Sequence, residues 1–245
     1  MSPISIPGKV TLKQQTNPAI VTDGLVLHLD AGNLSSYPGT GTTWTDLSGN
    51  GNNGTLNGVP TPTYDSSNLG SIGFDGSNHY GTILDDNSLT STTSLTINCW
   101  VKATAFNSTY SSLVGKGTAD TNEEYAVLFH SSFLYFDVGS GGPLTQPSYT
   151  FNTDTWYNIC CTHTRTSGSS SLLCYVNGVF LNNSTTRSTD PVNDNSFPVS
   201  IGSRYHNSIT RPLSGNLAQV SIYNKALTST EVTQNYNALK WRFGL

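Results

Sequence analysis

The chain has 245 residues, of which only 11% are charged, and its formal net charge is −4. An average globular protein carries roughly 25% charged residues, so serine, threonine, asparagine and glycine must supply most of the polar surface. The chain has no run of lysine and arginine, which argues against nucleic-acid binding, because that binding needs clustered cations. No apolar run reaches about 18 residues, so no membrane-spanning segment is expected.

Residues 1 to 22 differ in pattern from the rest of the chain. Prolines interrupt any regular element there, while apolar side chains recur at Ile4, Ile6, Val10 and Leu12. This pattern predicts an extended arm that pairs with another surface, and a frayed terminus is the alternative. No secretory leader is expected, because prolines stand where such a leader needs an apolar core.

The body of the chain begins at Gly24 and reads as a series of short strands. The segment from Ala31 to Pro62 is rich in glycine and is expected to be irregular. Strands are predicted at 25–30, 71–74, 80–84, 95–101, 112–114, 125–130, 133–138, 156–163, 172–180, 199–201 and 215–223. Their alternation and spacing predict an all-β fold, an antiparallel β-sandwich of the jelly-roll type. One short C-terminal helix is expected after Thr228, which begins a capping-box sequence with Glu231.

The segments 156–163 and 172–180 predict a pair of antiparallel strands, and the dipeptide Asn177-Gly178 predicts a tight hairpin turn. Four cysteines lie in predicted strand interiors: Cys99, Cys160, Cys161 and Cys174. Counting back from a turn near Gly168 places Cys174 opposite Cys161 or Thr162. Buried free thiols are favoured over a cross-strand disulfide, which would be strained.

Five segments together resemble the concanavalin A-like, laminin G-like (pentraxin-type) jelly-roll module. They are the hairpin just described and residues 46–56, 72–80, 95–102 and 217–232, and their order matches that family from about residue 23 to the C-terminus. The resemblance implies a laminin G-like β-sandwich domain at 23–245, and the proline-interrupted pattern before it predicts an extended N-terminal arm at 1–22.

A narrower resemblance concerns residues 24–33, 36–51 and 234–245, which are similar to segments of virion proteins of tailed phages. It implies a virion structural protein, a capsid decoration or tail-associated module anchored by its arm and assembled in the host cytoplasm. The partners then expected are other virion proteins such as the major capsid protein, and the expected assembly is a homo-oligomer, with a trimer as one form. The alternative is a non-catalytic carbohydrate-binding adhesion module on a tail fibre or bacterial surface, with a surface polysaccharide as ligand.

The sequence does not predict an enzyme. Glycoside hydrolysis needs two carboxylates about 5 to 9 Å apart across a cleft, and the only glutamates are Glu123, Glu124 and Glu231. Neighbouring residues of an extended strand point to opposite faces, so Glu123 and Glu124 cannot form that pair.

No cofactor is assigned, but calcium stays open as a ligand of Asp46 and Asp75, with turn capping by the two side chains as the favoured alternative. Glycan binding would require aromatic rings with planar polar partners in loops. The candidates in expected loops are Tyr37, Trp44, Tyr64, Tyr149, Tyr205 and His206, with Arg204 and Arg211 nearby. Trp44 has the alternative role of filling the end of the sandwich.

Overall fold

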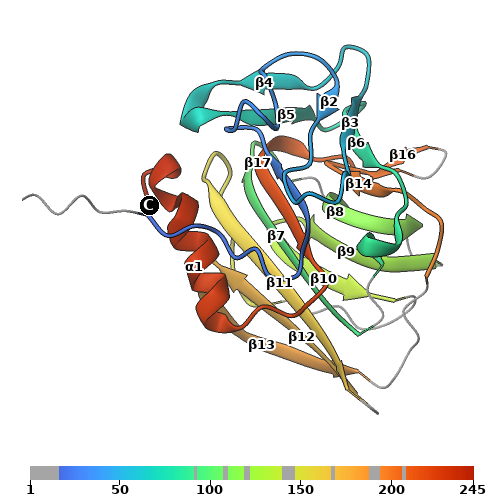
Figure 1. The fold of residues 1–245 in the computed structure, drawn as a ribbon, viewed down its shortest axis with the longest axis vertical. Helices are drawn as coiled ribbons and strands as arrows, with labels where there is room; N and C mark the ends of the chain where they lie inside the picture. The colour runs from blue at the N-terminus through green and yellow to red at the C-terminus, as the bar shows by residue number, and fades with distance from the viewer. Residues whose placement is uncertain are drawn as a thin grey trace, which may run out of the picture.

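The structure, a computed structural model, describes residues 17–90, 93–106, 110–118, 122–139, 147–166, 169–187, 194–205 and 208–245. Two antiparallel sheets face each other (Figure 1). The eight-stranded sheet has the order β13 (Val179–Arg187), β12 (Ser169–Val176), β11 (Tyr157–Thr166), β7 (Ser94–Ala103), β17 (Ser214–Tyr223), β5 (Ser71–Asp75) and β4 (Thr63–Asp65), and β1 (Leu25–Asp30) also pairs with β17.

The seven-stranded sheet has the order β10 (Phe133–Val138), β9 (Asn122–His130), β8 (Tyr110–Thr118), β14 (Val199–Ile201), β6 (Tyr80–Ile83), β3 (Gly54–Asn57) and β2 (Thr43–Trp44). A small hairpin joins β15 (Arg204–Tyr205) to β16 (Ile209–Thr210). Three short 3₁₀ turns complete the described elements: η1 (Ser67–Leu69), η2 (Asn87–Leu89) and η3 (Lys240–Phe243). The predicted β-sandwich is confirmed.

The core fills the space between the two sheets because alternate strand residues are apolar. Leu27 and Leu29 of β1 and Val127 and Phe129 of β9 are fully buried members of one continuous cluster. In a strand, successive side chains point to opposite faces. The residues between these core positions therefore line the outer faces of the sandwich.

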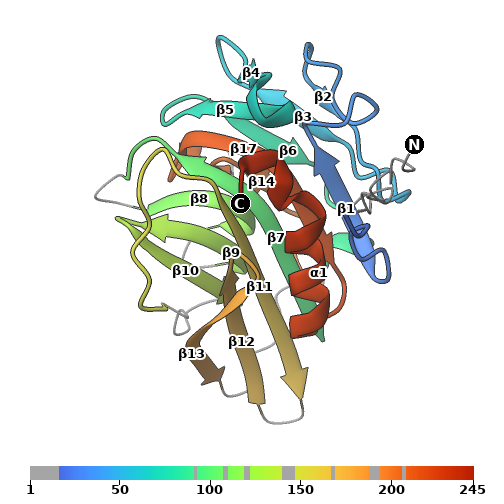
Figure 2. The same ribbon diagram turned by 90° about the vertical axis from the view of Figure 1, so that its left-hand side faces the viewer.

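Helix α1 (Ser229–Leu239) covers the outer face of the eight-stranded sheet (Figures 1 and 2). Its N-terminus carries the predicted capping box between Thr228 and Glu231. The turn after the helix places Phe243 over Trp100, with ring centroids 4.2 Å apart, and Tyr236 stacks on the same indole at 5.8 Å. A second apolar layer therefore lies outside this sheet. None of the helices in the described part of the chain is long and apolar enough to cross a membrane.

One sequence expectation needs correction. The segment 31–62 is not wholly irregular, because β2 and β3 form inside it and extend the seven-stranded sheet. Residues 17–22, the last part of the expected arm, lie along helix α1: Gln234 donates a hydrogen bond to Ala19 O (2.8 Å), and Val21 N donates one to Asn235 Oδ1 (2.8 Å). The arm residues Ile4, Ile6, Val10 and Leu12 lie outside the described residues.

The hairpin and the cysteines agree with prediction. Asn177 and Gly178 both have positive φ, 52° and 75°, as a type I′ turn requires. Cys174 lies directly opposite Cys161, and all four cysteines are buried and free. The four thiols thus serve as small apolar side chains in the strand interiors.

Candidate functional site

Two of the predicted sugar-binding rings lie in the core. Tyr37 is 2% exposed and Trp44 1% exposed, and both belong to the cluster between the sheets. The segment that holds them is tied down by Ser36, whose hydroxyl donates to Thr45 O over 2.6 Å. The expectation that these rings are available in loops is wrong, because Trp44 lies in β2 and both rings pack into the core cluster.

Arg204 is also buried. Its side chain lies against Gly115 and forms an ion pair with Glu123. This pair fixes the β15–β16 hairpin over the seven-stranded sheet, so the guanidinium is a structural cation and not an exposed sugar ligand. The side chain of Tyr205 and the whole of His206 lie outside the described part of the chain.

The two aspartates proposed for calcium both cap turns. The Asp46 carboxylate accepts hydrogen bonds of 2.8 to 3.0 Å from the backbone N–H groups of His28, Ser48 and Asn52. Asp75 accepts bonds of 2.8 to 3.0 Å from Ser77, Asn78 and His79. Over the described ranges, no three His, Cys, Asp or Glu side chains gather as a metal-binding group. Calcium binding therefore stays a prediction, and turn capping accounts for both side chains.

A cluster of half-buried rings lies on the outer face of the seven-stranded sheet. We call Tyr110, His130, Tyr135 and Arg211 the aromatic patch. The ring of Tyr110 lies 4.6 Å from that of His130, and Tyr135 stands edge-on to both, with centroids 5.7 and 5.6 Å away. The Arg211 guanidinium carbon lies 4.5 Å from the Tyr110 centroid.

The strand register explains why these side chains meet. Tyr110 of β8 lies opposite His130 of β9, and His130 lies opposite Phe133 of β10. Tyr135 follows Phe133 by two residues and so shares its face. The intervening residues point into the core: Phe129, Leu134 and Phe136. Three neighbouring strands therefore carry aromatic side chains on one outer surface, and Phe133 is 39% exposed there.

The chemistry of the aromatic patch suits an uncharged, hydroxyl-rich ligand. Aromatic rings pack against C–H groups, and a guanidinium donates several hydrogen bonds. Burial, with Tyr110 nearby, raises the pKa of Tyr135, so its hydroxyl is protonated at neutral pH and can donate. The oxygen of that hydroxyl lies 3.5 Å from His130 Nδ1.

The sequence contains a signal for two members of this patch. The segments 125–130 and 133–138 are predicted strands, and each carries an aromatic residue on its outward face. Period-two alternation with aromatic residues on both faces could have identified His130 and Tyr135. Arg211 is a candidate from the sequence, but no local pattern places it beside Tyr110, which lies about 100 residues earlier in the chain.

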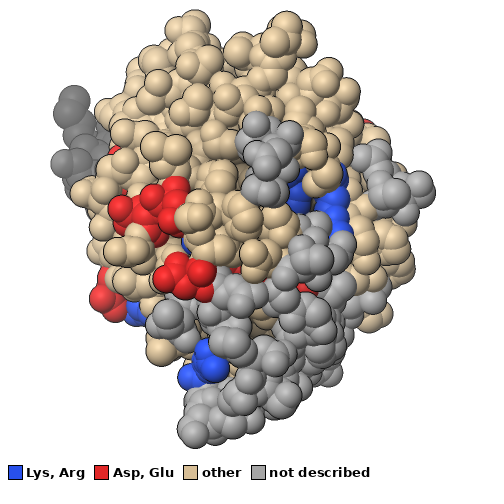
Figure 3. Space-filling view, turned by 90° about the vertical axis from the view of Figure 1, so that its right-hand side faces the viewer, with Lys and Arg blue, Asp and Glu red and all other residues tan. Residues whose placement is uncertain are grey.

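A polar pocket of about 450 Å³ lies near the β3 and β6 end of the same sheet. It is lined by Asn50, Gly51, Asn52, Asn53, Thr55, Ile83, Leu84, Asp85 and Asp86. Figure 3 shows the side of the molecule that faces away from helix α1, where most of the described surface is uncharged. The pocket itself is polar and carries the two carboxylates of Asp85 and Asp86.

Each of the three glutamates has an ion-pair partner. Glu124 is fully buried, and its Oε2 lies 2.5 Å from Lys116 Nζ. Glu231 caps helix α1 and lies 2.8 Å from Lys225 Nζ, and Glu123 holds Arg204. These partners give all three carboxylates structural roles.

The fold is a β-sandwich of two facing antiparallel sheets with jelly-roll strand order. One outer face carries half-buried polar and aromatic side chains, and together these features are lectin-like. The model of the concanavalin A-like lectin/glucanases superfamily matches residues 75–233, which is more than half of the chain. The chain belongs to this superfamily, as its resemblance to the laminin G-like module predicted. No curated protein matches the sequence.

Several solved structures share the fold at low sequence identity. The binding domain of botulinum neurotoxin DC, in complex with rat synaptotagmin II, has a TM-score of 0.65 at 13% identity, over 89% of this chain and 52% of that chain. A botulinum neurotoxin type C structure, whose title reports that cell entry depends on two ganglioside molecules, gives 0.65 at 14% identity, over 89% and 52%. Trypanosoma rangeli sialidase with 2,3-difluorosialic acid gives 0.67 at 16% identity, over 97% and 36%.

The chain thus spans about half the length of the toxin chains that it matches and about a third of the sialidase. At these identities the likeness concerns the fold alone.

Proposed function

We propose that this protein is a non-catalytic carbohydrate-binding module and that the aromatic patch is its sugar-binding site. The observation that carries the proposal is the meeting of three half-buried rings and a guanidinium on one outer sheet surface. Membership in a lectin and glucanase superfamily supports it. The titles of the toxin structures, which name gangliosides and a sialyl sugar as ligands of those proteins, agree with this direction.

We propose binding without hydrolysis because the glutamate carboxylates already form ion pairs within the fold. Glu123 pairs with Arg204 and Glu124 pairs with Lys116, and both carboxylates are buried in the fold. Burial raises the pKa of Glu124, although the Lys116 ammonium beside it acts in the opposite direction. A glycosidase needs a protonated general acid beside a second carboxylate. Activity on a panel of polysaccharides that is lost in a single Asp or Glu variant would contradict this part of the proposal.

Binding is best tested with Tyr110→Ala and Tyr135→Ala on a glycan array and by affinity electrophoresis in soluble polysaccharides. Each variant should weaken the binding of any retained glycan at least about tenfold, which corresponds to about 1.4 kcal/mol. Phe180→Ala is the matched control, because Phe180 is 42% exposed on the eight-stranded sheet, away from the patch. Equal binding by the patch variants, or a loss only in the control, would overturn the assignment.

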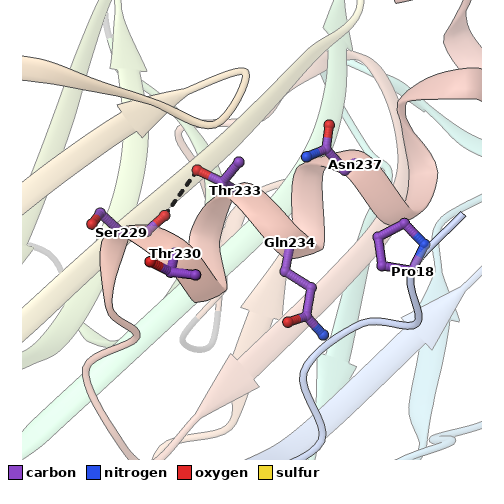
Figure 4. Close-up of a pocket in the computed structure, with 6 residues that line it drawn as sticks. All are labelled: Pro18, Ser229, Thr230, Thr233, Gln234 and Asn237. Atoms are coloured by element: carbon purple, nitrogen blue, oxygen red, sulfur yellow. Dashed lines mark hydrogen bonds between the residues drawn. The ribbon is translucent and has the colours of Figure 1, made fainter.

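A second proposal concerns the setting of the module: it is displayed on a virion, anchored by residues 1–16. The supporting observation is that residues 17–22 lie against helix α1, on the side of the sandwich opposite the aromatic patch. Figure 4 shows Pro18 beside Gln234 and Asn237 of the helix, where a shallow pocket of about 450 Å³ opens. A partner held through the preceding residues would leave the patch facing outward.

Deletion of residues 1–16 tests this second proposal. We expect the truncated chain to keep its melting temperature and its glycan binding and to lose incorporation into particles with virion proteins such as the major capsid protein. A quadruple Ile4, Ile6, Val10 and Leu12 to serine variant serves as the control that keeps chain length. Normal incorporation of both variants would exclude anchoring by the arm. The oligomer expected for such a module, a trimer for example, can be measured by light scattering.

A further inference from the structure

Two buried thiols face each other across neighbouring strands. Cys161 of β11 lies directly opposite Cys174 of β12, and their sulfur atoms are 3.5 Å apart. Both side chains are fully buried within the core cluster. Directly opposed residues of antiparallel strands have Cα atoms about 4.5 to 5.5 Å apart, which lies within the range of about 4.4 to 6.8 Å that a disulfide requires.

The other two cysteines are worse partners. Cys160 points to the opposite face of the sheet, where it packs in the layer under helix α1. Cys99 lies opposite Ile159, so it is a diagonal neighbour of Cys161. Diagonal positions are separated by about 7 to 8 Å, beyond the usual reach of a disulfide. The strand register thus selects one pair of the four cysteines.

We propose that Cys161 and Cys174 are a covalent cross-linking site, a cross-strand disulfide that forms when the chain folds in the presence of a small disulfide oxidant. One cysteine thiolate attacks a sulfur of the oxidant, for example oxidised glutathione, whose S–S bond breaks and releases one glutathione thiolate. The second cysteine thiolate then attacks the mixed disulfide and releases the second glutathione. The two cysteines lose two protons and two electrons, and glutathione receives them.

Burial determines when this reaction can occur. Desolvation raises the pKa of the Cys161 thiol well above its ordinary value, and no oxidant can reach a fully buried sulfur. The reactive thiolate is therefore scarce in the folded protein. Oxidation is expected during folding, and the bond, once enclosed, is expected to resist small reductants until the protein unfolds. The protein is therefore expected to fold with the disulfide when an oxidant is present and without it when only reductants are present.

The test is to refold the full chain in parallel with a reduced and oxidised glutathione couple and with dithiothreitol. Each sample is then alkylated in denaturant, and its intact mass and its peptides are measured. The glutathione sample should be two hydrogen atoms lighter before alkylation, carry two fewer alkyl groups, and yield a peptide pair that joins Cys161 to Cys174. Its melting temperature should exceed that of the reduced sample by at least about 5 °C.

A variant with Cys99→Ala and Cys160→Ala keeps only the proposed pair and should behave in the same way, whereas Cys161→Ala should abolish the cross-link. If a variant fails to fold, the peptide map of the wild type still decides the question. Four free thiols after refolding with glutathione to the native state, or a bond to Cys99 or Cys160, would overturn the proposal.

Discussion

Lys116 is a fully buried cation with four polar partners. Its side chain is fully buried, and its ammonium lies 2.5 Å from Glu124, 3.0 Å from Asp85, 2.7 Å from Asn195 O and 3.2 Å from Thr90 Oγ1. It joins strand β8 to the segments that precede and follow η2. In a chain with so few charges, such a cation has a structural use: it satisfies polar groups that the fold encloses.

Lys116→Ala should lower the free energy of unfolding by about 3 to 5 kcal/mol, because it leaves the buried Glu124 carboxylate without its partner. Urea denaturation followed by circular dichroism measures this change. Lys225→Ala is the control: that lysine pairs with Asp23 and Glu231 nearer the surface, so it should cost less than about 1 kcal/mol. A double variant, Lys116→Met with Glu124→Leu, should recover part of the loss. Equal effects of the two lysine substitutions would show that the buried network adds no stability.

At the scale of elements, the turn of the β12–β13 hairpin packs against helix α1. Gly178 has a φ of +75°, and a Cβ atom added there would lie 3.0 Å from Tyr236 Cδ1 of the helix. Its carbonyl also accepts a hydrogen bond of 3.3 Å from Thr233 Oγ1. The turn therefore needs glycine for two reasons, the left-handed backbone and the close approach of the helix.

Gly178→Ala should destabilise the protein by about 1 to 2 kcal/mol from the backbone alone, and by more because of the contact with Tyr236. Gly41→Ala separates the two causes, since Gly41 has a φ of +89° with nothing within 4 Å of the added atom. Thermal unfolding should show a larger loss for Gly178→Ala than for Gly41→Ala. If the two losses are equal, contact with the helix adds nothing to the requirement for glycine.

At the scale of the whole molecule, the C-terminal segment closes the outer layer and links distant parts of the chain. Arg242 is buried and lies 2.8 Å from Asp30 at the end of β1, and Asn68 donates a hydrogen bond of 2.8 Å to the Arg242 carbonyl. Phe243 covers Trp100 and Trp156. The last residues thus shield two indoles that would otherwise face water.

Phe243→Ala should reduce the free energy of unfolding by about 2 kcal/mol, below the value of 3 to 5 kcal/mol for a fully enclosed phenylalanine, because Phe243 is only half-buried. Tryptophan emission should shift to longer wavelength in the folded state as water reaches Trp100. The neighbouring Trp241→Ala is the control, since Trp241 is 51% exposed, and it should change stability little. Unchanged emission and stability in Phe243→Ala would contradict the covering role.

The sequence by itself determined those features that depend on local periodicity and backbone conformation. The alternation of Leu27 and Leu29, the positive φ of Asn177-Gly178 and the capping box at Thr228 act within a few residues. For that reason they could be read directly, whereas the superfamily was indicated by the resemblance of five segments to the laminin G-like module. Leu25 does not share the face of Leu27 and Leu29, because the register of β1 shifts between Leu25 and Leu27. Counting along one hairpin left Cys161 and Thr162 as possible partners of Cys174, and the strand register in the structure selects Cys161.

Only the tertiary structure decided which side chains reach the surface and which residues become neighbours. Tyr37, Trp44 and Arg204 lie in polar, glycine-rich or turn-like sequence, but long-range packing buries them. Tyr110, His130 and Arg211 meet because separate strands and a connection more than 70 residues further along the chain converge on one sheet face. Burial and convergence depend on contacts between segments far apart in sequence, and no local pattern specifies those contacts.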